Sequence, residues 1–196
     1  MVFAPLVRAE LLDAVALDTP GLVEQVATAA RASGLITHAM GLTTDVRAEG
    51  IRMTGKDPQA WGEANLFVGA DGAVVGEGDV AGTGSFSSMQ VVEERLVEVV
   101  ERSCQFAEGA WRVIDAQREV RQVCVTVAVP DASNKVFATA PLGNSMSMSM
   151  SLGPVVIAPQ PPVQVRREDV GNSATVRRLV ASVKRVFQDA NAVRPR

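Results

Sequence analysis

The fold is decided by residues 65–129, which open with NLFVGADGAVVGEGDV at 65–80 and close with QVCVTVAV at 122–129. The opening part holds two short apolar runs on either side of the pair Asp71-Gly72. An Asp-Gly pair accepts the positive φ angles of a type I′ turn, so the two runs are expected to pair as antiparallel strands. The sequence therefore predicts a β-hairpin that turns at Asp71-Gly72.

A long amphipathic helix is predicted to follow at residues 87–115. Ser87 and Gln90 have the spacing of a capping box, and Phe86 can pack on Val91 as a hydrophobic staple. Apolar residues then recur every three or four positions, as they do along one face of a helix. They are Met89, Val92, Leu96, Val99, Val100, Cys104, Ala107, Trp111 and Ile114.

The closing part is typical of a strand, because Val123, Val125, Val127 and Val129 occupy every second position before a proline. An apolar helix face and a half-apolar strand each need a partner that covers them. We therefore predict an α+β fold. It consists of an antiparallel sheet of about five to seven strands, with the 87–115 helix packed on one face and terminal helices beside it.

The N-terminal part is expected to contribute helices and short strands. Apolar spacing predicts a first helix within residues 3–17, and Thr19-Pro20 is a suitable start for a second helix that ends at Ser33-Gly34. Short strands are predicted at 35–39 and 51–54, with an extended segment between them.

Three further elements are expected after the 122–129 strand. Residues 137–139 are predicted to return beside that strand. Residues 145–152 read SMSMSMSL, which as a strand places Met146, Met148, Met150 and Leu152 on one face. That face is either the buried side of an ordinary strand or a methionine-lined surface that adapts to varied partners. Four prolines within 153–162 suit an edge strand or an extended connector.

A basic C-terminal helix is predicted after Asn172 or Ser173, either of which can cap it. Its apolar positions are Val176, Leu179, Val180, Val183, Val186 and Phe187. Residues 164–196 hold eight arginines and lysines and three acids, whereas the whole chain has a net charge of −3. We therefore describe residues 1–163 as a single α+β domain with an N-terminal helical hairpin. Residues 164–196 are predicted to be a basic helix that packs on that domain or extends from it.

Composition is that of a globular protein. The 196 residues are 47% hydrophobic, with a mean hydropathy of +0.14. This apolar content suffices for one well-buried core or two small ones and excludes a disordered chain. The apolar runs are far shorter than the roughly 18–20 residues that span a bilayer, and the start does not read as a secretory leader. We therefore expect a cytoplasmic protein without a membrane partner, in which Cys104 and Cys124 are buried free thiols.

A glycine-rich stretch is the first candidate for a ligand site. It contains Gly76, Gly78, Gly82 and Gly84. The stretch runs from a strand toward a helix start, the setting in which backbone amides bind phosphate. Its spacing matches neither a dinucleotide-binding motif nor a P-loop, and Glu77 and Asp79 would repel an anion, so a flexible exit from the hairpin is favoured. The alternative is a small-ligand or nucleotide-binding cleft, with or without enzymatic activity, in which these acids position a substrate or a hard cation.

Catalytic and metal sites are not indicated by the sequence. His38 is the single histidine and no nucleophile motif accompanies it, so we predict no catalytic residue. One histidine and two separated cysteines are too few for a common zinc site, and we predict neither a metal nor a cofactor. The acids of the long helix fit a solvated face better than acid–base chemistry. Two pairs on it, Glu98–Arg102 and Glu108–Arg112, are spaced for ion pairs one turn apart.

The favoured function is a non-enzymatic binding or assembly protein that acts through protein–protein contacts and is oligomeric. Apolar stripes are plentiful in this sequence, whereas convergent titratable groups are few. The predicted contact surfaces are the methionine strand and the last helix. Their residues are Met146, Met148, Met150, Arg177, Arg178, Lys184 and Arg185.

A second alternative is a nucleic-acid-binding protein. In that case Arg166, Arg167 and the basic residues of the last helix would contact phosphates. Aromatic residues, which stack on bases, make up 4% of the chain, and helix-turn-helix spacing is not evident. Both observations disfavour this alternative.

Residues 58–130 resemble a region of known proteins. The segment Trp61-Gly62-Glu63-Ala64, the Asp71-Gly72 hairpin, the long acidic helix and the Val123 strand follow one another in this order. The order is similar to that of the region which follows the Schlafen-type AlbA domain in some actinobacterial proteins. The AlbA-type domain itself is not visible in this sequence, so the resemblance implies no activity for this chain.

Overall fold

The computed structural model describes residues 1–7, 10–17, 19, 21–56, 63–80, 90–130, 132, 135–138 and 161–192. Its strands are β1 (Val2–Pro5), β2 (Gly41–Arg47), β3 (Gly50–Lys56), β4 (Glu63–Gly69), β5 (Val74–Glu77), β6 (Gln90–Val92), β7 (Gln122–Thr126), β8 (Val136–Ala138) and β9 (Val163–Arg166). Its helices are α1 (Ala14–Leu17), α2 (Leu22–Ala32), α3 (Glu93–Ile114), the short 3-10 helix η3 (Arg167–Asp169) and α4 (Ser173–Ala192). The predicted methionine strand lies outside the described residues, as does most of the proline-rich segment after it.

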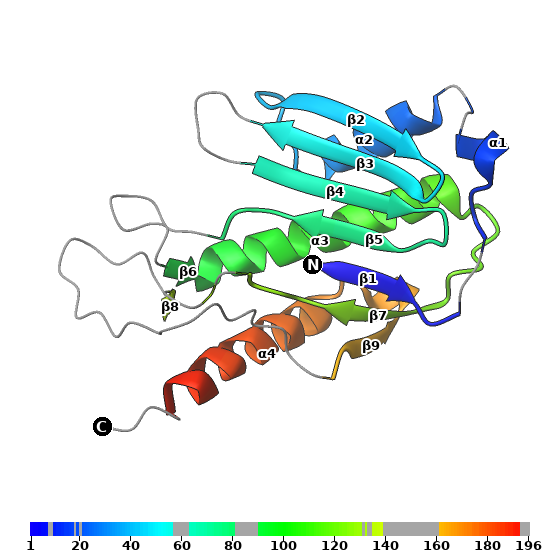
Figure 1. Ribbon diagram of the computed structural model, residues 1–196. Helices are drawn as coiled ribbons and strands as arrows, with labels where there is room; N and C mark the ends of the chain where they lie inside the picture. Colours follow the sequence, from blue (N-terminus) through cyan, green and yellow to red (C-terminus); the bar gives the residue numbers. More distant parts are fainter. Residues whose placement is uncertain are drawn as a thin grey trace.

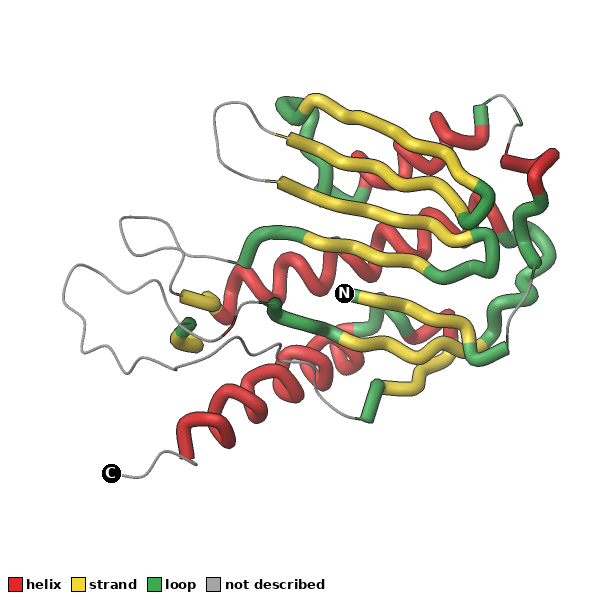
Figure 2. The backbone as a smooth tube through the Cα atoms, in the orientation of Figure 1, coloured by secondary structure: helices red, strands yellow, loops and turns green. Residues whose placement is uncertain are grey.

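Seven strands form one antiparallel sheet in the order β2-β3-β4-β5-β1-β7-β9. The predicted α+β class and antiparallel sheet are therefore confirmed. Helix α3 crosses one face of the sheet and contacts both α2 and α4. Figure 1 shows α2 toward the β2–β3 end of the sheet and α4 toward the β7–β9 end, and Figure 2 shows the same arrangement by element type. The described residues thus form two layers, a sheet and a helical layer.

The core lies between these two layers, and Trp111 of α3 is one of its largest fully buried side chains. The Trp111 side chain is fully buried and meets the Phe3 ring edge to face, at 6.0 Å between centroids. Its indole N–H donates a hydrogen bond to the Gly72 carbonyl at 2.8 Å. One side chain therefore fastens the long helix both to β1 and to the hairpin loop.

The predicted hairpin is confirmed as β4–β5, but its turn differs from the predicted type I′ turn. The Gly69 N–H bonds the Ala73 carbonyl at 2.7 Å, so the loop has three residues rather than two. Gly72 has a φ of 84°, whereas Asp71 does not have a positive φ. The Asp71 carboxylate instead accepts a hydrogen bond from the Ala73 N–H at 3.0 Å. Such three-residue loops place glycine in the left-handed position just before the second strand.

The predicted start of the long helix at residue 87 is wrong, because α3 begins at Glu93. Residues 90–92 form β6, which pairs in parallel with β8 through Gln90↔Val136. The residue before the helix, Val92, makes no side-chain capping bond. All three β6 residues are buried, so pairing with a distant strand overrides the local helix signals.

Residues 137–139 were predicted to return beside the 122–129 strand, and this is wrong for the part that the structure describes. Val136–Ala138 is β8, whose partner is β6 and not β7. The neighbours of β7 are β1 and β9. The Val123 strand itself is confirmed, with Val123 and Val125 on the buried face.

Two N-terminal predictions are also wrong. In place of one helix within 3–17, the structure has most of β1 and the short helix α1, and β1 lies between β5 and β7 inside the sheet. The expected strand at 35–39 is a turn segment in which Leu35 and Ile36 are buried. The second helix (α2) and the strand around 51–54 (β3) are confirmed, and β2 occupies the segment expected to be extended.

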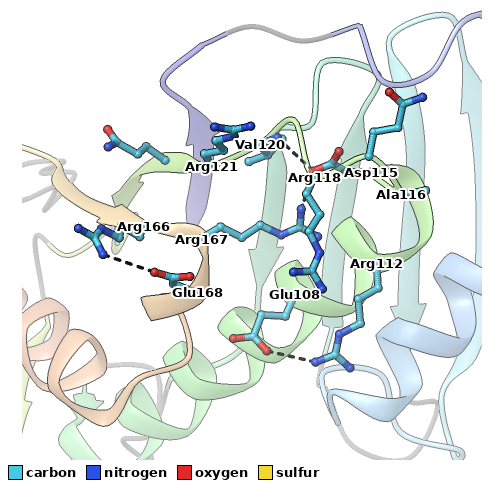
Figure 3. Close-up of a pocket in the computed structure, with 12 residues that line it drawn as sticks. Glu108, Arg112, Asp115, Ala116, Arg118, Val120, Arg121, Arg166, Arg167 and Glu168 are labelled. Atoms are coloured by element: carbon cyan, nitrogen blue, oxygen red, sulfur yellow. Dashed lines mark hydrogen bonds and ion pairs between the residues drawn. The ribbon is translucent and has the colours of Figure 1, made fainter.

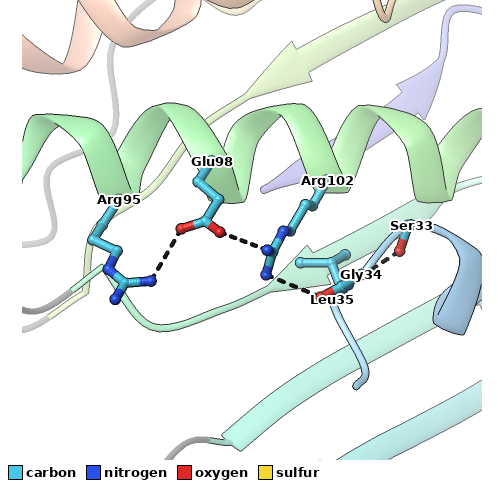
Figure 4. Close-up of polar contacts among 6 residues, drawn as sticks. All are labelled: Ser33, Gly34, Leu35, Arg95, Glu98 and Arg102. Carbon is cyan, nitrogen blue, oxygen red and sulfur yellow. Dashed lines mark hydrogen bonds and ion pairs between the residues drawn. The ribbon is translucent and has the colours of Figure 1, made fainter. Parts of the chain in front are cut away.

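The predicted ion pair Glu98–Arg102 is confirmed within α3, and Arg102 also connects this helix to the end of α2. Figure 4 shows Glu98 between Arg95, at 3.1 Å, and Arg102, at 2.5 Å. Arg102 also donates a hydrogen bond to the Gly34 carbonyl at 3.0 Å. A cation at the C-terminal end of a helix is favourable because the unpaired carbonyls there carry partial negative charge. The predicted pair Glu108–Arg112 is present at 3.7 Å.

The last helix is confirmed as α4, and Asn172 caps it by accepting a hydrogen bond from the Ala174 N–H at 2.9 Å. Its predicted apolar positions are buried, except for the partly buried Val186. Strand β9 spans the predicted domain boundary at residues 163 and 164. Among the described residues, no helix combines the length and the apolarity needed to cross a membrane.

Candidate functional site

One face of the sheet is free of helices within the part of the chain that the structure describes. Side chains alternate between the two faces of each strand. In β4, Leu66 and Val68 are buried, whereas Phe67 is only partly buried. In β1, Phe3 is 0% exposed and Val2 is 40% exposed. We name the side that carries the partly exposed set the open face.

The centre of the open face is mostly apolar. The residues concerned, which we name the open-face stripe, are Val2, Ala4, Phe67, Val75, Cys124 and Thr126. Neighbours within this set are paired in register across β4, β5, β1 and β7. Side chains paired in this way are about 5 Å apart, so they form a continuous surface. Leu6 and Val7, just beyond β1, are also exposed, at 41% and 76%.

Charged residues of both signs border the stripe on the side of β2, β3 and β4. Arg47 pairs with Asp45 at 2.8 Å, and Lys56 pairs with Glu63 at 3.8 Å. Arg52 of β3 lies opposite Asp45 in the register of β2 and β3. This border can therefore meet another charged surface of mixed sign without net repulsion.

A cavity of about 910 Å³ lies where the end of α3, residues 115–122 and the β9–η3 segment meet. Its basic lining consists of Arg112, Arg118, Arg121, Arg166 and Arg167. Its acidic lining consists of Glu108, Asp115 and Glu168. Figure 3 shows Arg112, Arg118 and Arg167 reaching the cavity from three different elements. We name this cavity the arginine pocket.

Asp115 holds the arginine pocket together. Its side chain is fully buried and accepts backbone hydrogen bonds from Glu119 at 2.8 Å and Val120 at 3.1 Å. It also pairs with Arg167 at 2.5 Å, and the Arg167 guanidinium lies 5.6 Å from the centre of the Trp111 ring. The end of α3, the loop after it and β9–η3 are thereby joined at one carboxylate.

Two of the four predicted glycines, Gly76 and Gly78, lie in the described part of the glycine-rich stretch. Gly76 lies within β5, and a Cβ on it would be 2.8 Å from the Ser103 hydroxyl. A Cβ on Gly78 would be 3.2 Å from the Val99 side chain. These two glycines therefore give α3 room to approach the sheet. The other two predicted positions, Gly82 and Gly84, lie outside the described residues.

The predicted partner-binding residues have three different settings in the structure. Met146, Met148 and Met150 lie outside the described residues. Arg177, Arg178 and Arg185 are exposed on α4. Lys184 is instead paired with Glu93 of α3 at 2.9 Å and lies 5.7 Å from the centre of the Phe137 ring, so its charge stabilises the attachment of α4 to its own domain.

The structure also places the single histidine and the polar residues after α3. His38 is exposed. Among the described residues, no group of three or more histidines, cysteines and acids is placed to hold a metal ion. Asp115, Arg118 and Arg121 were not singled out from the sequence. Their one signal was the polar tract AQREVRQ at 116–122, between a helix and a strand, which is also the pattern of an ordinary loop.

Both cysteines are free thiols, as predicted, but their surroundings differ. Cys104 is buried in α3, and burial raises the pKa of its thiol to about 12, with Glu108 and Glu101 adding to the rise. Cys124 was expected to be buried and is instead partly exposed on the open face. The reactivity of the Cys124 thiol can therefore report whether the open face is covered.

No family model, curated protein or solved structure matches this chain. The resemblance noted over residues 58–130 therefore remains a prediction.

Proposed function

We propose that this chain is a non-enzymatic binding protein that acts through protein–protein contacts, and that it pairs with a second copy of itself through the open face. The observation that carries the proposal is the open-face stripe. Apolar side chains on four adjacent strands lie in register on a side of the sheet that no helix of the described residues covers. Covering such a surface removes apolar area from water, which favours association.

A second copy is the partner that the border of the stripe favours. A two-fold interface brings the same surface of two molecules together, so it has to be complementary to itself. The border contains acids and bases in close pairs, such as Asp45 with Arg47 and Lys56 with Glu63. A two-fold axis that runs across the strands would bring this border against the same border of the second copy, where acids can meet bases. A net charge of −3 over the whole chain adds little repulsion between copies.

Light scattering coupled to size-exclusion chromatography tests the proposal. The expected result for the native chain is a species of twice the 20.7 kDa chain mass that dissociates on dilution. Val75→Lys places a charge at the centre of the stripe, where each copy would have to bury it, so this variant should be monomeric. Thr43→Lys, on the charged border, is the matched control and should remain dimeric.

Circular dichroism of both variants checks that each is folded. A native chain that is monomeric at all concentrations up to roughly 1 mM would contradict the proposal, because that limit corresponds to about 4 kcal/mol of association free energy. A dimer that Val75→Lys leaves intact would equally contradict it, since the contact would then lie elsewhere.

A further inference from the structure

The arginine pocket has an excess of positive charge. It is lined by five arginines and three acids, which come from the end of α3, the loop before β7 and the β9–η3 segment. Guanidinium groups that line one cavity repel one another, because the protein around them screens charge less than bulk water does. An arrangement of this kind is stabilised when an anion lies among the arginines.

Each acid of the pocket already has a basic partner. Asp115 pairs with Arg167 at 2.5 Å. Glu108 pairs with Arg112 at 3.7 Å, which leaves the guanidinium of Arg112 largely exposed. Glu168 pairs with Arg166 of β9 at 3.5 Å.

Two arginines of the pocket are left without such a partner. Within the described residues, neither Arg118 nor Arg121 forms an ion pair. Both come from the short loop that Asp115 holds through its bonds to the backbone of residues 119 and 120. Arg118 and Arg121 therefore line the cavity without an acidic partner among the described residues, on a loop whose backbone Asp115 holds.

The pocket is also pre-organised. Arg167 is held by Asp115 on one side and by the Trp111 ring on the other, so its position is set before any ligand arrives. Arg118 has a φ of 57°, a left-handed conformation that an arginine seldom adopts. A hydrogen bond from the Arg118 N–H to the Asp115 carbonyl, at 3.2 Å, closes the turn that holds it. The Arg167 side chain and the Arg118 backbone are thus fixed before a ligand arrives, which reduces the conformational freedom lost on binding.

The geometry points to a binding site for a small ligand that carries a diphosphate group. Arginine forms paired, parallel hydrogen bonds with phosphate oxygens, and the five arginines that line the cavity can serve more than one phosphate. A volume of about 910 Å³ exceeds what inorganic phosphate needs and is within the range of sites for metabolite-sized ligands.

A nucleic acid fits the pocket less well than a small ligand. Nucleic-acid backbones are bound along extended basic tracks, because their charges are spread along the strand. Here Glu108 and Glu168 interrupt the basic lining of the cavity, so the positive charge does not form an extended track.

Isothermal titration with pyrophosphate at low ionic strength tests this assignment. The expected result is saturable binding with one site per chain. Arg118→Gln and Arg121→Gln should each weaken it about tenfold, the effect of losing one hydrogen bond between charged groups. Arg121→Gln is the safer of the two variants, because residue 121 does not have the unusual backbone of residue 118. Arg178→Gln, on the exposed side of α4, is the matched control and should bind like the native chain.

Three results would overturn the assignment. The first is the absence of binding heat and of any rise in melting temperature with pyrophosphate. The second is equal weakening by Arg178→Gln and Arg121→Gln, which would indicate attraction by overall charge. The third is tighter binding of a single-stranded oligonucleotide than of pyrophosphate at the same salt concentration, which would assign the pocket to nucleic acid.

Discussion

Replacing Asp115 by asparagine should lower the free energy of unfolding by about 2–3 kcal/mol. The Asp115 side chain is 0% exposed and Arg167 is 18% exposed, and two backbone N–H groups share the same carboxylate. Arg167 and these two N–H groups thus donate to two carboxylate oxygens. Asparagine has one oxygen, and its NH₂ group would face at least one of these donors without a hydrogen bond. Removing one partner of a fully buried ion pair costs about 3–5 kcal/mol. The partial exposure of Arg167 lets water take over some of the lost interaction, which reduces the expected cost.

Urea unfolding followed by circular dichroism measures this change. A slope of about 2 kcal/mol per molar urea converts the expected loss to a shift of roughly 1–1.5 M in the midpoint. Asp45→Asn is the matched control, because its carboxylate pairs with Arg47 on the exposed surface at 2.8 Å. Exposed pairs contribute at most about 1 kcal/mol, so the control midpoint should move far less. An Asp115→Asn midpoint within 0.2 M (roughly 0.4 kcal/mol) of the native value would refute the reasoning.

Three further changes have expected outcomes. Gly76→Ala should destabilise the fold by about 1–3 kcal/mol in urea unfolding, because its Cβ would lie 2.8 Å from the Ser103 hydroxyl. Trp111→Phe should lower the free energy of unfolding by about 2–4 kcal/mol in the same assay, since it removes buried volume and leaves the Gly72 carbonyl without its indole donor. Folding raises the pKa of the Cys104 thiol from 9.0 to about 12, so the thiol ionises in the unfolded chain at a lower pH than in the folded chain. The free energy of unfolding should therefore fall between these two pH values, by up to roughly 1.4 kcal/mol per pH unit.

Control variants separate the proposed causes of these changes from general effects of substitution. Gly41→Ala, whose Cβ would have no neighbour closer than 3.9 Å, should show no comparable loss, and an equal loss in both glycine variants would contradict the packing argument. For the pH dependence, the reference is Cys104→Ala, which should lose less stability above pH 9 than the native chain does. Parallel pH profiles of the two proteins would show that the thiol is not responsible.

The hairpin and the long helix could be predicted from the sequence because their signals are local. Asp71-Gly72 marks a turn whatever surrounds it, and valines at every second position from residue 123 mark one buried strand face. The detail of the turn could not be predicted, because a three-residue loop and a two-residue loop both accept glycine at position 72.

The errors share a physical cause, which is that distant partners decide the structure. The apolar spacing of the long helix continues back through Val92, yet residues 90–92 are a strand because β8 lies beside them. Strand β1 is too short to show an alternation, and its place depends on β5 and β7, which come far later in the chain.

The candidate sites were beyond sequence reasoning for the same reason. The open-face stripe draws its residues from four strands, and its members become neighbours only through the order of the sheet. The arginine pocket joins the end of α3 to Arg166 and Arg167, which the sequence had suggested as phosphate contacts in a basic helix. In the structure these two residues lie on β9 and η3, next to a loop that Asp115 fixes.

The reactivity of Cys124 tests pairing through the open face most directly. Cys124 belongs to the open-face stripe, whereas Cys104 is buried with its pKa near 12, so a thiol-specific disulfide reagent at pH 7.5 should report on Cys124 alone. If two copies cover the stripe, the rate constant of this reaction should fall as protein concentration rises, and Val75→Lys should react at the fast, dilute-limit rate at every concentration. A rate constant that is independent of concentration while light scattering detects a dimer would place the contact elsewhere and contradict the account.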